Sequence, residues 1–490
     1  MHPSAIFPLF VSIMFAIWAA YQLYSYAMKG TRKRVLFVSY MGFLVSFTCV
    51  VLIPFDIDST LANRYRGFLY YAWRVMYWSL QLLSWVIYPF NMEKERTGSW
   101  RKSLHRNAIW WGIYALVALV ALAYFFVVTN LGFKGLLAFA YAASNTFGLL
   151  LIILLAGYGL VACPRWMYLK SNPKDYLESL YVRAVIADDA RMGSKLDLID
   201  IYNMVKKSVS LTDPNMIASK TFLIETYGYT VATSEGEIQE NEEDSAKLKE
   251  ALQTAKRSNC SFQLTIKDCV KYERIVSEHN GISTRFDRIS VMGMRGVSIS
   301  FALLSILILV GEATIFTEVY WLSVLAIFFR KGVWESPVTS SFGSFFVQLL
   351  LSVPLLWIYY CCYWSLTRLK LAKFYGLYPM HNTDTISLMW CGGMLIRIAF
   401  PLVYNYLFVL HVPDHPSTVF EEMQGWMDVV PILGDSAIEF FPLLILVVAL
   451  LTLTNMYSRM MKVFGLDSLQ FESDQGSADE GRKLVIKYNK

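Results

Sequence analysis

Nine apolar runs of membrane-spanning length divide the chain, five before a long charged stretch and four after it. Each run is long enough to cross a hydrocarbon core of about 30 Å as a helix. The pattern therefore predicts an all-α polytopic membrane protein with about nine transmembrane helices. We place the spans at residues 5–28, 35–55, 69–90, 108–129, 136–162, 291–316, 344–366, 386–410 and 437–458.

The long stretch between the two groups of spans has a different pattern. Apolar residues recur there with heptad-like spacing from Tyr176 onward, and charged residues lie between them. Residues 234–244 interrupt this pattern, because they are acidic and poor in apolar side chains, as is typical of a connector. We expect a helical hairpin or short coiled coil that projects into the cytosol.

These patterns divide the chain into four predicted parts. Residues 1–163 form an N-terminal membrane half of five helices, and residues 291–462 form a C-terminal membrane half of four. Residues 164–290 form the cytosolic helical loop, and residues 463–490 form a polar cytosolic tail that we expect to be disordered from Ser473 onward. The apolar segment from Tyr320 to Phe329 is too short for a further span, so we expect an interfacial or re-entrant piece.

Lysine and arginine are distributed unevenly between the short loops, which predicts the orientation. Residues 29–34, 94–106, 368–373 and 459–462 are rich in them and fall on one side of the predicted membrane, whereas the opposite loops are poorer. Cytosolic loops carry the excess of positive charge. We therefore expect the N-terminus outside and the C-terminus in the cytosol, in the plasma membrane first and an endosomal or lysosomal membrane next.

Composition excludes a soluble protein and disfavours nucleic acid as a partner. The chain is 56% hydrophobic and only 17% charged, and its net charge is +6. Since the basic residues lie beside the spans rather than in one stripe, lipid headgroups account for them better than nucleic acid. The seven cysteines show no metal-binding spacing and predict no disulfide framework.

Arg397 is the residue that most suggests chemistry, because it lies near the middle of the eighth span. An arginine at that depth costs about 2.5–3.5 kcal/mol on insertion scales, so it should face the bundle interior or a wet cavity. Two interpretations stay open: a ligand or ion path, or a structural pair with a carboxylate or with backbone carbonyls. The candidate path residues are Arg397, Glu312, Asp56 and Glu439.

Glycine and proline residues inside the last three spans are candidate helix breaks. Such breaks let membrane helices open or line a cavity, but Gly and Pro are also ordinary residues of membrane helices. Asp56 and Asp58 likewise have two interpretations, as a cation site or as solvated charges at a span end. The candidate breaks are Gly392, Gly393, Pro401, Pro354 and Pro442.

The motifs of common enzymes are missing from the sequence. We find no nucleophile elbow, zinc-protease motif, phosphate-binding loop or histidine box. His411 and His415 have a spacing that suits a metal on a helix, but Pro413 and Pro416 predict a loop there. We therefore expect no enzyme, no catalytic residue, no cofactor and no metal site.

Four groups of short motifs, spread over both membrane halves, are collectively specific. They are Ile53–Asp56 with Asn63–Arg64, Trp73–Trp78 with Tyr88–Phe90, Ala143–Gly148 with Gly157–Val161 and Pro164–Arg165, and Met427–Pro431 with Phe441–Pro442 and Phe464–Leu466.

In these motifs and in their order, the chain resembles the limb-region membrane protein family, which includes the lipocalin-interacting receptors, and most closely its domain-containing protein 2 branch. The resemblance implies a receptor-like or regulatory membrane protein. Members are linked to lipocalin uptake, control of G-protein-coupled receptor signalling and lysosomal cofactor traffic. It supplies no catalytic residues.

Two classes of function follow from these observations. The first is a non-enzymatic receptor, or a regulator of membrane receptor signalling or trafficking, whose cytosolic helical arm recruits partners. The second is a transporter, channel or lipid scramblase with Arg397 on the path. The expected partners are the lipid bilayer, a membrane receptor or cytosolic signalling or trafficking protein, and an apolar ligand.

Overall fold

The computed structural model separates into two compact units. One comprises Met1–Trp166 and Gly296–Glu472, here called the membrane unit, and the other comprises Met167–Arg295 and Ser473–Lys490, here called the arm. The structure describes residues 6–127, 132–206, 213–229, 242–279, 285–314, 323–330, 341–371, 376–378, 381–410, 416–424, 443–457, 460, 469–471 and 477–488.

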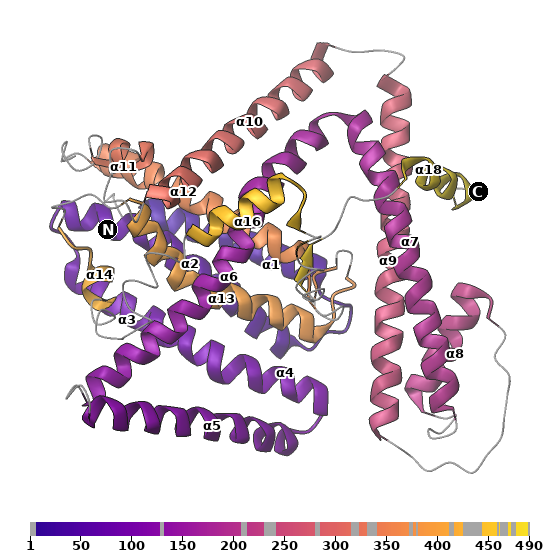
Figure 1. Cartoon of the computed structure of the whole chain (residues 1–490), viewed down its shortest axis with the longest axis horizontal. Coiled ribbons are helices and arrows are strands. Elements are labelled where there is room, and N and C mark those ends of the chain that lie inside the picture. Colours follow the sequence, from indigo (N-terminus) through magenta and orange to yellow (C-terminus); the bar gives the residue numbers. More distant parts are fainter. Residues whose placement is uncertain are drawn as a thin grey trace. The chain divides into compact units, whose positions relative to one another are not determined.

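The described residues are almost entirely helical (Figure 1), and seven of their helices are long and apolar enough to cross a membrane. This confirms the all-α polytopic class, while the count of nine spans stays a prediction. The seven spans lie in α1 (Ile6–Tyr26), α2 (Lys33–Leu61), α5 (Trp100–Val127), α6 (Gly132–Ser171), α10 (Arg285–Thr314), α12 (Ser341–Arg368) and α13 (Thr385–Val409).

The two remaining predicted spans take other forms in the described residues. The third is divided among α3 (Arg66–Leu82), a π-helical turn η2 (Leu83–Ile87) and α4 (Tyr88–Thr97). Of the ninth, the structure describes α16 (Leu443–Leu453), which is too short to span alone.

Short elements complete the membrane unit. The predicted interfacial piece contains α11 (Val324–Phe329), and α14 (Val419–Gln424) follows α13 along the chain. Strands β1 (Leu369–Leu371) and β2 (Leu469–Phe471) pair antiparallel.

Helices α2 and α13 pack against each other along their lengths and form the centre of the membrane unit (Figure 1). The Tyr88 hydroxyl of α4 reaches between them and donates a 3.0 Å hydrogen bond to the Val38 carbonyl oxygen. A Cβ atom at Gly42 or Gly392 would overlap this hydroxyl. Small residues let membrane helices approach closely, so Gly392 is required here for packing.

The candidate helix breaks that lie within the described residues do not interrupt their helices, which corrects that expectation for them. Helix α13 continues through Gly392, Gly393 and Pro401, and α12 continues through Pro354. Neighbouring membrane helices compensate the backbone groups that a proline frees. Pro442 lies outside the described residues. The change of helix type that the structure does contain, η2, was not predicted.

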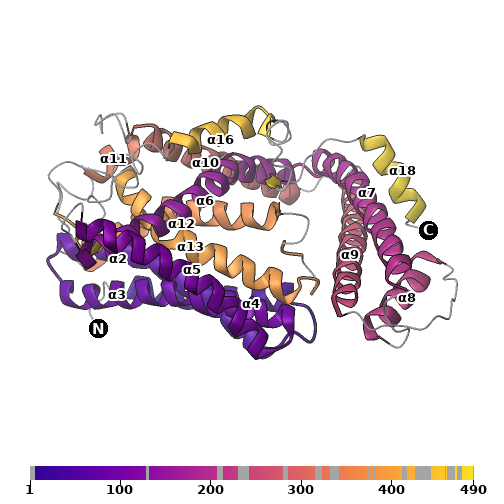
Figure 2. The same ribbon diagram turned by 60° about the horizontal axis from the view of Figure 1, so that its bottom comes forward.

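The arm is a helical hairpin of α7 (Pro173–Val205) and α9 (Glu242–His279), which lie side by side, with α8 (Pro214–Tyr227) packed on both (Figure 2). Asn172 and Asp213 cap α7 and α8, each accepting a hydrogen bond from a backbone N–H two residues later. The buried core of this hairpin contains Leu198, Tyr202, Val205, Met216, Leu223, Leu248, Ala251, Leu252 and Ala255.

The expected disorder of the tail is wrong for residues 478–488. They form α18 (Ala478–Tyr488), which packs against α7 and α9. Gly481 and Val485 are buried one helical turn apart. A Cβ atom at Gly481 would overlap the Tyr181 carbonyl oxygen, so α18 lies in direct contact with the α7 backbone. Helix α18 is thus the fourth helix of the arm.

Candidate functional site

Arg397 is half-buried in the membrane unit and has no carboxylate partner among the described residues. Its Nε–H donates a 3.1 Å hydrogen bond to the Ser84 hydroxyl, and its guanidinium lies 5.3 Å from the centre of the Phe147 ring. Its Nη1 and Nη2 groups have no hydrogen-bond partner in the described part of the chain. A guanidinium with open donors is chemically able to bind an anion.

Two segments far from Arg397 in the sequence position this guanidinium. Ser84 belongs to the π-helical turn η2, and such turns occur frequently at functional sites. On the opposite side, a Cβ atom at Gly148 would overlap the Arg397 carbonyl oxygen and the Pro401 ring, so α6 and α13 are in close backbone contact. Phe147, next to Gly148, thereby presents its ring to the cation.

Asp56 does not pair with Arg397 but is fully buried, and it joins three helices. Its carboxylate accepts hydrogen bonds from Trp73 Nε1 of α3 at 2.8 Å and from the backbone N–H groups of Phe420 at 2.9 Å and Val419 at 3.2 Å. Thr60 adds a longer contact at 3.4 Å within α2. The carboxylate thus caps the first turn of α14 and fixes the buried Trp73 indole.

The interpretation of Asp56 and Asp58 as solvated charges is wrong. Helix α2 extends beyond the predicted span to Leu61, and both side chains are buried. Asp58 accepts a 2.8 Å hydrogen bond from Gln348 Nε2 of α12. Since charges inside a membrane protein must be paired or hydrogen-bonded, these two aspartates hold helices together.

Glu312 lies apart from the arginine as well. It is 2% exposed, and its Oε1 accepts a 2.6 Å hydrogen bond from Asn405 Nδ2, which joins α10 to α13. Its Oε2 has no hydrogen-bond partner among the described residues. Glu439, the fourth candidate path residue, lies outside them. Among the described residues, no hydrogen bond or ion pair joins Arg397, Asp56 and Glu312 to one another, and a path through them stays a prediction.

A cluster around Arg191 in the arm was missed by sequence reasoning. Its Nη2 donates a 2.7 Å hydrogen bond to the Tyr488 hydroxyl, and its Nε donates one of 2.9 Å to Asp188. The guanidinium lies 4.2 Å from the Phe262 ring centre and 4.9 Å from that of Tyr488. These contacts attach α18 to α7 and α9. The available signal was the spacing of Gly481 and Val485.

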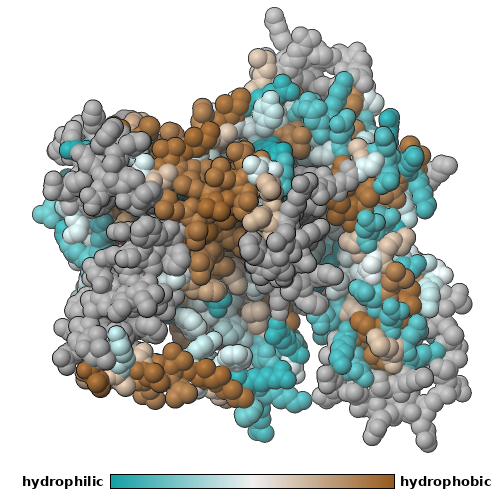
Figure 3. Space-filling view, viewed as in Figure 1, coloured by the Kyte–Doolittle hydropathy of each residue, from teal (hydrophilic) through white to brown (hydrophobic). Residues whose placement is uncertain are grey.

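The arm also exposes apolar side chains that its own core does not use. The space-filling view shows hydrophobic patches within a largely hydrophilic surface over this region (Figure 3). The exposed fractions of the apolar side chains on α7 and α8 range from 43% to 69%. Apolar side chains that are exposed on the surface of a helix pair can contact another helix. The exposed side chains on α7 and α8 are Met192, Leu196, Met204, Ile217 and Ile224.

The reactivity of Cys269 tests whether the hairpin is closed. Burial, with the nearby Glu273 and Asp268 carboxylates, raises the pKa of the Cys269 thiol to about 12. Burial also raises the pKa of Cys260, which is only partly buried. Because the thiolate is the reactive form, we expect N-ethylmaleimide at pH 8 to label Cys269 at least about tenfold more slowly than Cys260. Peptide mass spectrometry of the intact protein measures both rates, and equal rates would show that α7 and α9 separate.

The amino-acid sequence of this chain is similar to those of a known family of membrane proteins. A family model described as LMBR1-like membrane protein matches residues 4–457. "LMBR1 domain-containing protein 2 homolog A" of Dictyostelium discoideum is 26% identical over 85% of this chain and 62% of its own length. The human "G-protein coupled receptor-associated protein LMBRD2" is 21% identical over 94% of this chain and 80% of its own length.

A further relative and the solved structures complete the comparison. The "LMBR1 domain-containing protein 2 homolog" of Drosophila melanogaster is 25% identical over 85% of this chain and 68% of its own length. No solved structure matches the chain. The chain spans 62% of the Dictyostelium relative, so that protein's full length is not represented here.

Proposed function

Because this chain belongs to the LMBR1-like membrane protein family, as its motifs suggested, we propose that it is a non-enzymatic membrane protein that associates with a G-protein-coupled receptor and regulates its signalling or trafficking. Relatives from human and chicken are named G-protein coupled receptor-associated protein LMBRD2. The observation that carries the proposal for this chain is the arm, with exposed apolar side chains on α7 and α8.

The arm supplies a surface for helical partners. Its core is already filled by residues of α7, α8 and α9. Leu196 and Ile224 are 60% and 46% exposed, so neither is needed to close that core. Amphipathic segments bind to each other through such apolar side chains. In this proposal, α7 and α8 contact a cytosolic helix or tail of the receptor.

The same proposal includes an orientation and a location. The N-terminus is outside, and the arm and C-terminus are in the cytosol, because the loops on that side hold the excess of lysine and arginine. The plasma membrane is the first location, where G-protein-coupled receptors signal. An endosomal or lysosomal membrane is the second, and it would fit a role in receptor traffic.

Co-purification of the full-length chain with tagged G-protein-coupled receptors of its source organism tests this proposal. We expect Leu196→Glu and Ile224→Glu to lower receptor recovery at least about fivefold, because each places a charge in an apolar contact. The matched control is Gln263→Glu, which adds the same charge at an exposed polar position of α9. The control should retain wild-type recovery.

Two outcomes would overturn the proposal. One is recovery of the receptors no greater than that of an unrelated multi-pass protein. The other is full recovery with both arm variants, which would remove the arm from the contact even if association itself were retained.

A transporter, channel or lipid scramblase is the second candidate function, and the open Nη1 and Nη2 groups of Arg397 favour it. Flux of anions and lipids in proteoliposomes distinguishes the two candidates. The receptor proposal predicts no flux. Flux that disappears in Arg397→Leu, but persists in the exposed control Arg74→Leu, would establish a path instead.

The stability of Arg397→Leu gives an independent prediction. The described side-chain contacts of Arg397 are one hydrogen bond to Ser84 and one ring contact with Phe147. Such a hydrogen bond contributes about 0.5–1.5 kcal/mol, or up to about 3 kcal/mol to a charged group. Leucine restores apolar volume, so we expect the thermal midpoint in detergent to change by only a few degrees. A collapse of expression would show that the arginine is structural.

A further inference from the structure

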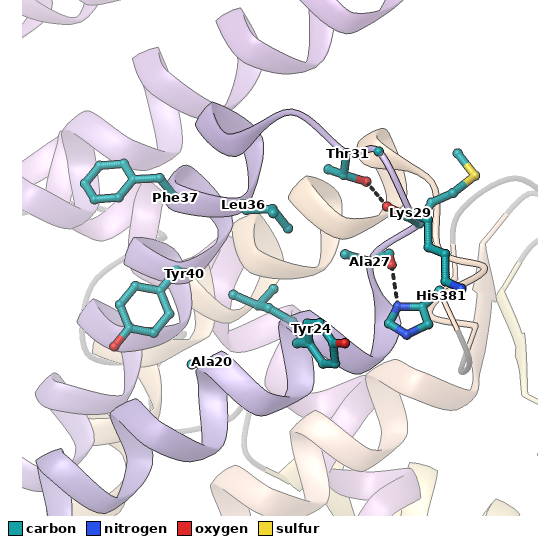
Figure 4. Close-up of a pocket in the computed structure, with 12 residues that line it drawn as sticks. Ala20, Tyr24, Ala27, Lys29, Thr31, Leu36, Phe37, Tyr40 and His381 are labelled. Atoms are coloured by element: carbon teal, nitrogen blue, oxygen red, sulfur yellow. Dashed lines mark hydrogen bonds between the residues drawn. The ribbon is translucent and has the colours of Figure 1, made fainter.

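A pocket of about 470 Å³ opens where α1 ends and α2 begins (Figure 4). Its lining is apolar and aromatic at one end and polar at the other. Phe37, Tyr40 and Ala20 lie at one end, whereas Lys29 and His381 lie at the other (Figure 4). Pockets that hold small ligands have volumes of about 300–1,000 Å³ and are mostly apolar with few polar groups. This pocket has both properties.

Backbone contacts hold the pocket's polar end in shape. The Met28 backbone N–H donates a 3.1 Å hydrogen bond to the Thr383 carbonyl oxygen, and His381 Nδ1 lies 3.0 Å from the Ala27 carbonyl oxygen. Gly30 turns the chain between the two helices with a φ of 91°, a conformation that favours glycine. The pocket is therefore formed before any ligand enters it.

One cation at this end has no partner among the described residues. Arg32 and Arg34 both contact Glu95, at 3.3 Å and 2.9 Å. Lys29 lines the pocket and is exposed, and it makes no hydrogen bond or ion pair among the described residues. An uncompensated ammonium therefore stands at the edge of an apolar pocket, which is the charge complement of an amphiphile with an anionic head.

The pocket also adjoins the ends of two candidate membrane spans, α1 and α2. Helix α1 is a span of 21 residues that ends at Tyr26, so Lys29 follows the hydrocarbon region directly. Tyr24 and Phe37 are 73% and 63% exposed in the membrane unit, on the ends of α1 and α2 that adjoin this turn. Lysine and aromatic side chains at span ends are positioned at the membrane interface.

We propose that this pocket binds one anionic phospholipid, with an acyl chain against Ala20, Leu36 and Phe37 and the headgroup phosphate paired with Lys29. Charge complementarity commits the site to an anionic lipid, since the headgroup of a zwitterionic lipid carries its own cation and offers Lys29 no net negative charge. The apolar end commits it to a membrane lipid, because a soluble phosphate would use only the polar end. In the orientation proposed above, the site faces the cytosolic leaflet, which is rich in anionic lipids.

Photo-crosslinking in proteoliposomes of phosphatidylcholine tests the site on the full-length protein. The probes are phosphatidic acid and phosphatidylcholine, each with a diazirine in the acyl chain, and mass spectrometry locates the modified residues. We expect phosphatidic acid to label residues 20–40 about tenfold more strongly than phosphatidylcholine, as expected for one charge-assisted pair. Unlabelled glycerol phosphate at millimolar concentration should not compete.

Three variants sharpen the result. Lys29→Gln should lower phosphatidic acid labelling about tenfold, to the level of phosphatidylcholine. Lys33→Gln is the matched control, since Lys33 is exposed and close by but does not line the pocket, and it should label like wild type. Ala20→Trp should fill the apolar end and abolish labelling by both probes without changing the thermal midpoint.

Each contrary result overturns the proposal. Equal labelling by the two lipids, or full labelling of Lys29→Gln, would mean ordinary contact with annular lipid. Labelling lost on addition of glycerol phosphate would mean a site for soluble anions. None of these results bears on receptor association, because the arm is not involved.

Discussion

Asp56→Ala is expected to lower the free energy of unfolding of the membrane unit by about 3–5 kcal/mol, as removal of a buried, hydrogen-bonded charge does. The carboxylate accepts bonds from the Trp73 indole and from two backbone N–H groups at the start of α14. In the alanine variant, these buried donors lose their acceptor. Asp56 is therefore the side chain whose hydrogen bonds join α2, α3 and α14.

Thermal unfolding of the detergent-solubilised protein measures this effect. Asp56→Asn keeps one acceptor oxygen, so we expect a smaller loss of about 1–2 kcal/mol. Glu422→Ala is the matched control, because Glu422 forms an exposed ion pair with Arg66 in the same corner of the unit, and such pairs contribute about 0–1 kcal/mol. If Asp56→Ala unfolds at the same temperature as Glu422→Ala, the capping role of Asp56 is refuted.

Gly481→Leu is expected to release α18 from the arm, with the second largest effect. A side chain at this position would overlap the Tyr181 carbonyl oxygen, which belongs to the α7 backbone and cannot move away cheaply. Release of α18 also breaks the contact between Arg191 and Tyr488 and uncovers the buried Phe262 ring. The helix would then open far more often than in the native arm.

Limited trypsin digestion of the full-length protein detects this release, since Arg482 and Lys483 lie inside α18. We expect cleavage there to be at least about tenfold faster than in the wild type, because proteolysis follows the population of the open state. Gly193→Leu is the matched control, because Gly193 is an exposed residue of α7 and a Cβ atom there meets nothing within 4 Å. Equal cleavage in both variants would show that Gly481 is not essential for docking.

The hydrophobic period predicts the spans well because burial in lipid or in a helix bundle is its direct cause. It predicted a span in each of α1, α2, α5, α6, α10, α12 and α13, although α2, α5, α6 and α10 extend beyond the predicted bounds. The hydrophobic period does not predict the burial or the hydrogen bonds of a side chain whose partners lie far away in the sequence. Asp56 looks solvated by position along the chain, yet its acceptor role depends on Trp73, 17 residues away, and on Phe420, 364 residues away.

The candidate site illustrates the same limit. Sequence singled out Arg397 because a charge in a span is rare, but its contacts with Ser84 and Phe147 come from distant segments whose approach no local pattern encodes. The arm hairpin was expected from its heptad-like spacing, whereas α18 was not. Its polar composition resembles disorder, and only the buried pair Gly481 and Val485 distinguishes it.

The π-helical turn η2 sets the phase of α4 relative to α3, because a π-helical turn holds one residue more than an α-helical turn. If Leu83–Ile87 adopted an α-helical turn with the same number of residues, α4 would rotate by about 100° relative to α3. The Tyr88 hydroxyl would then swing out from between Gly42 and Gly392, and Ser84 would lose its phase toward Arg397. A substitution that converts η2 to an α-helix should therefore disturb both contacts without changing any residue that makes them.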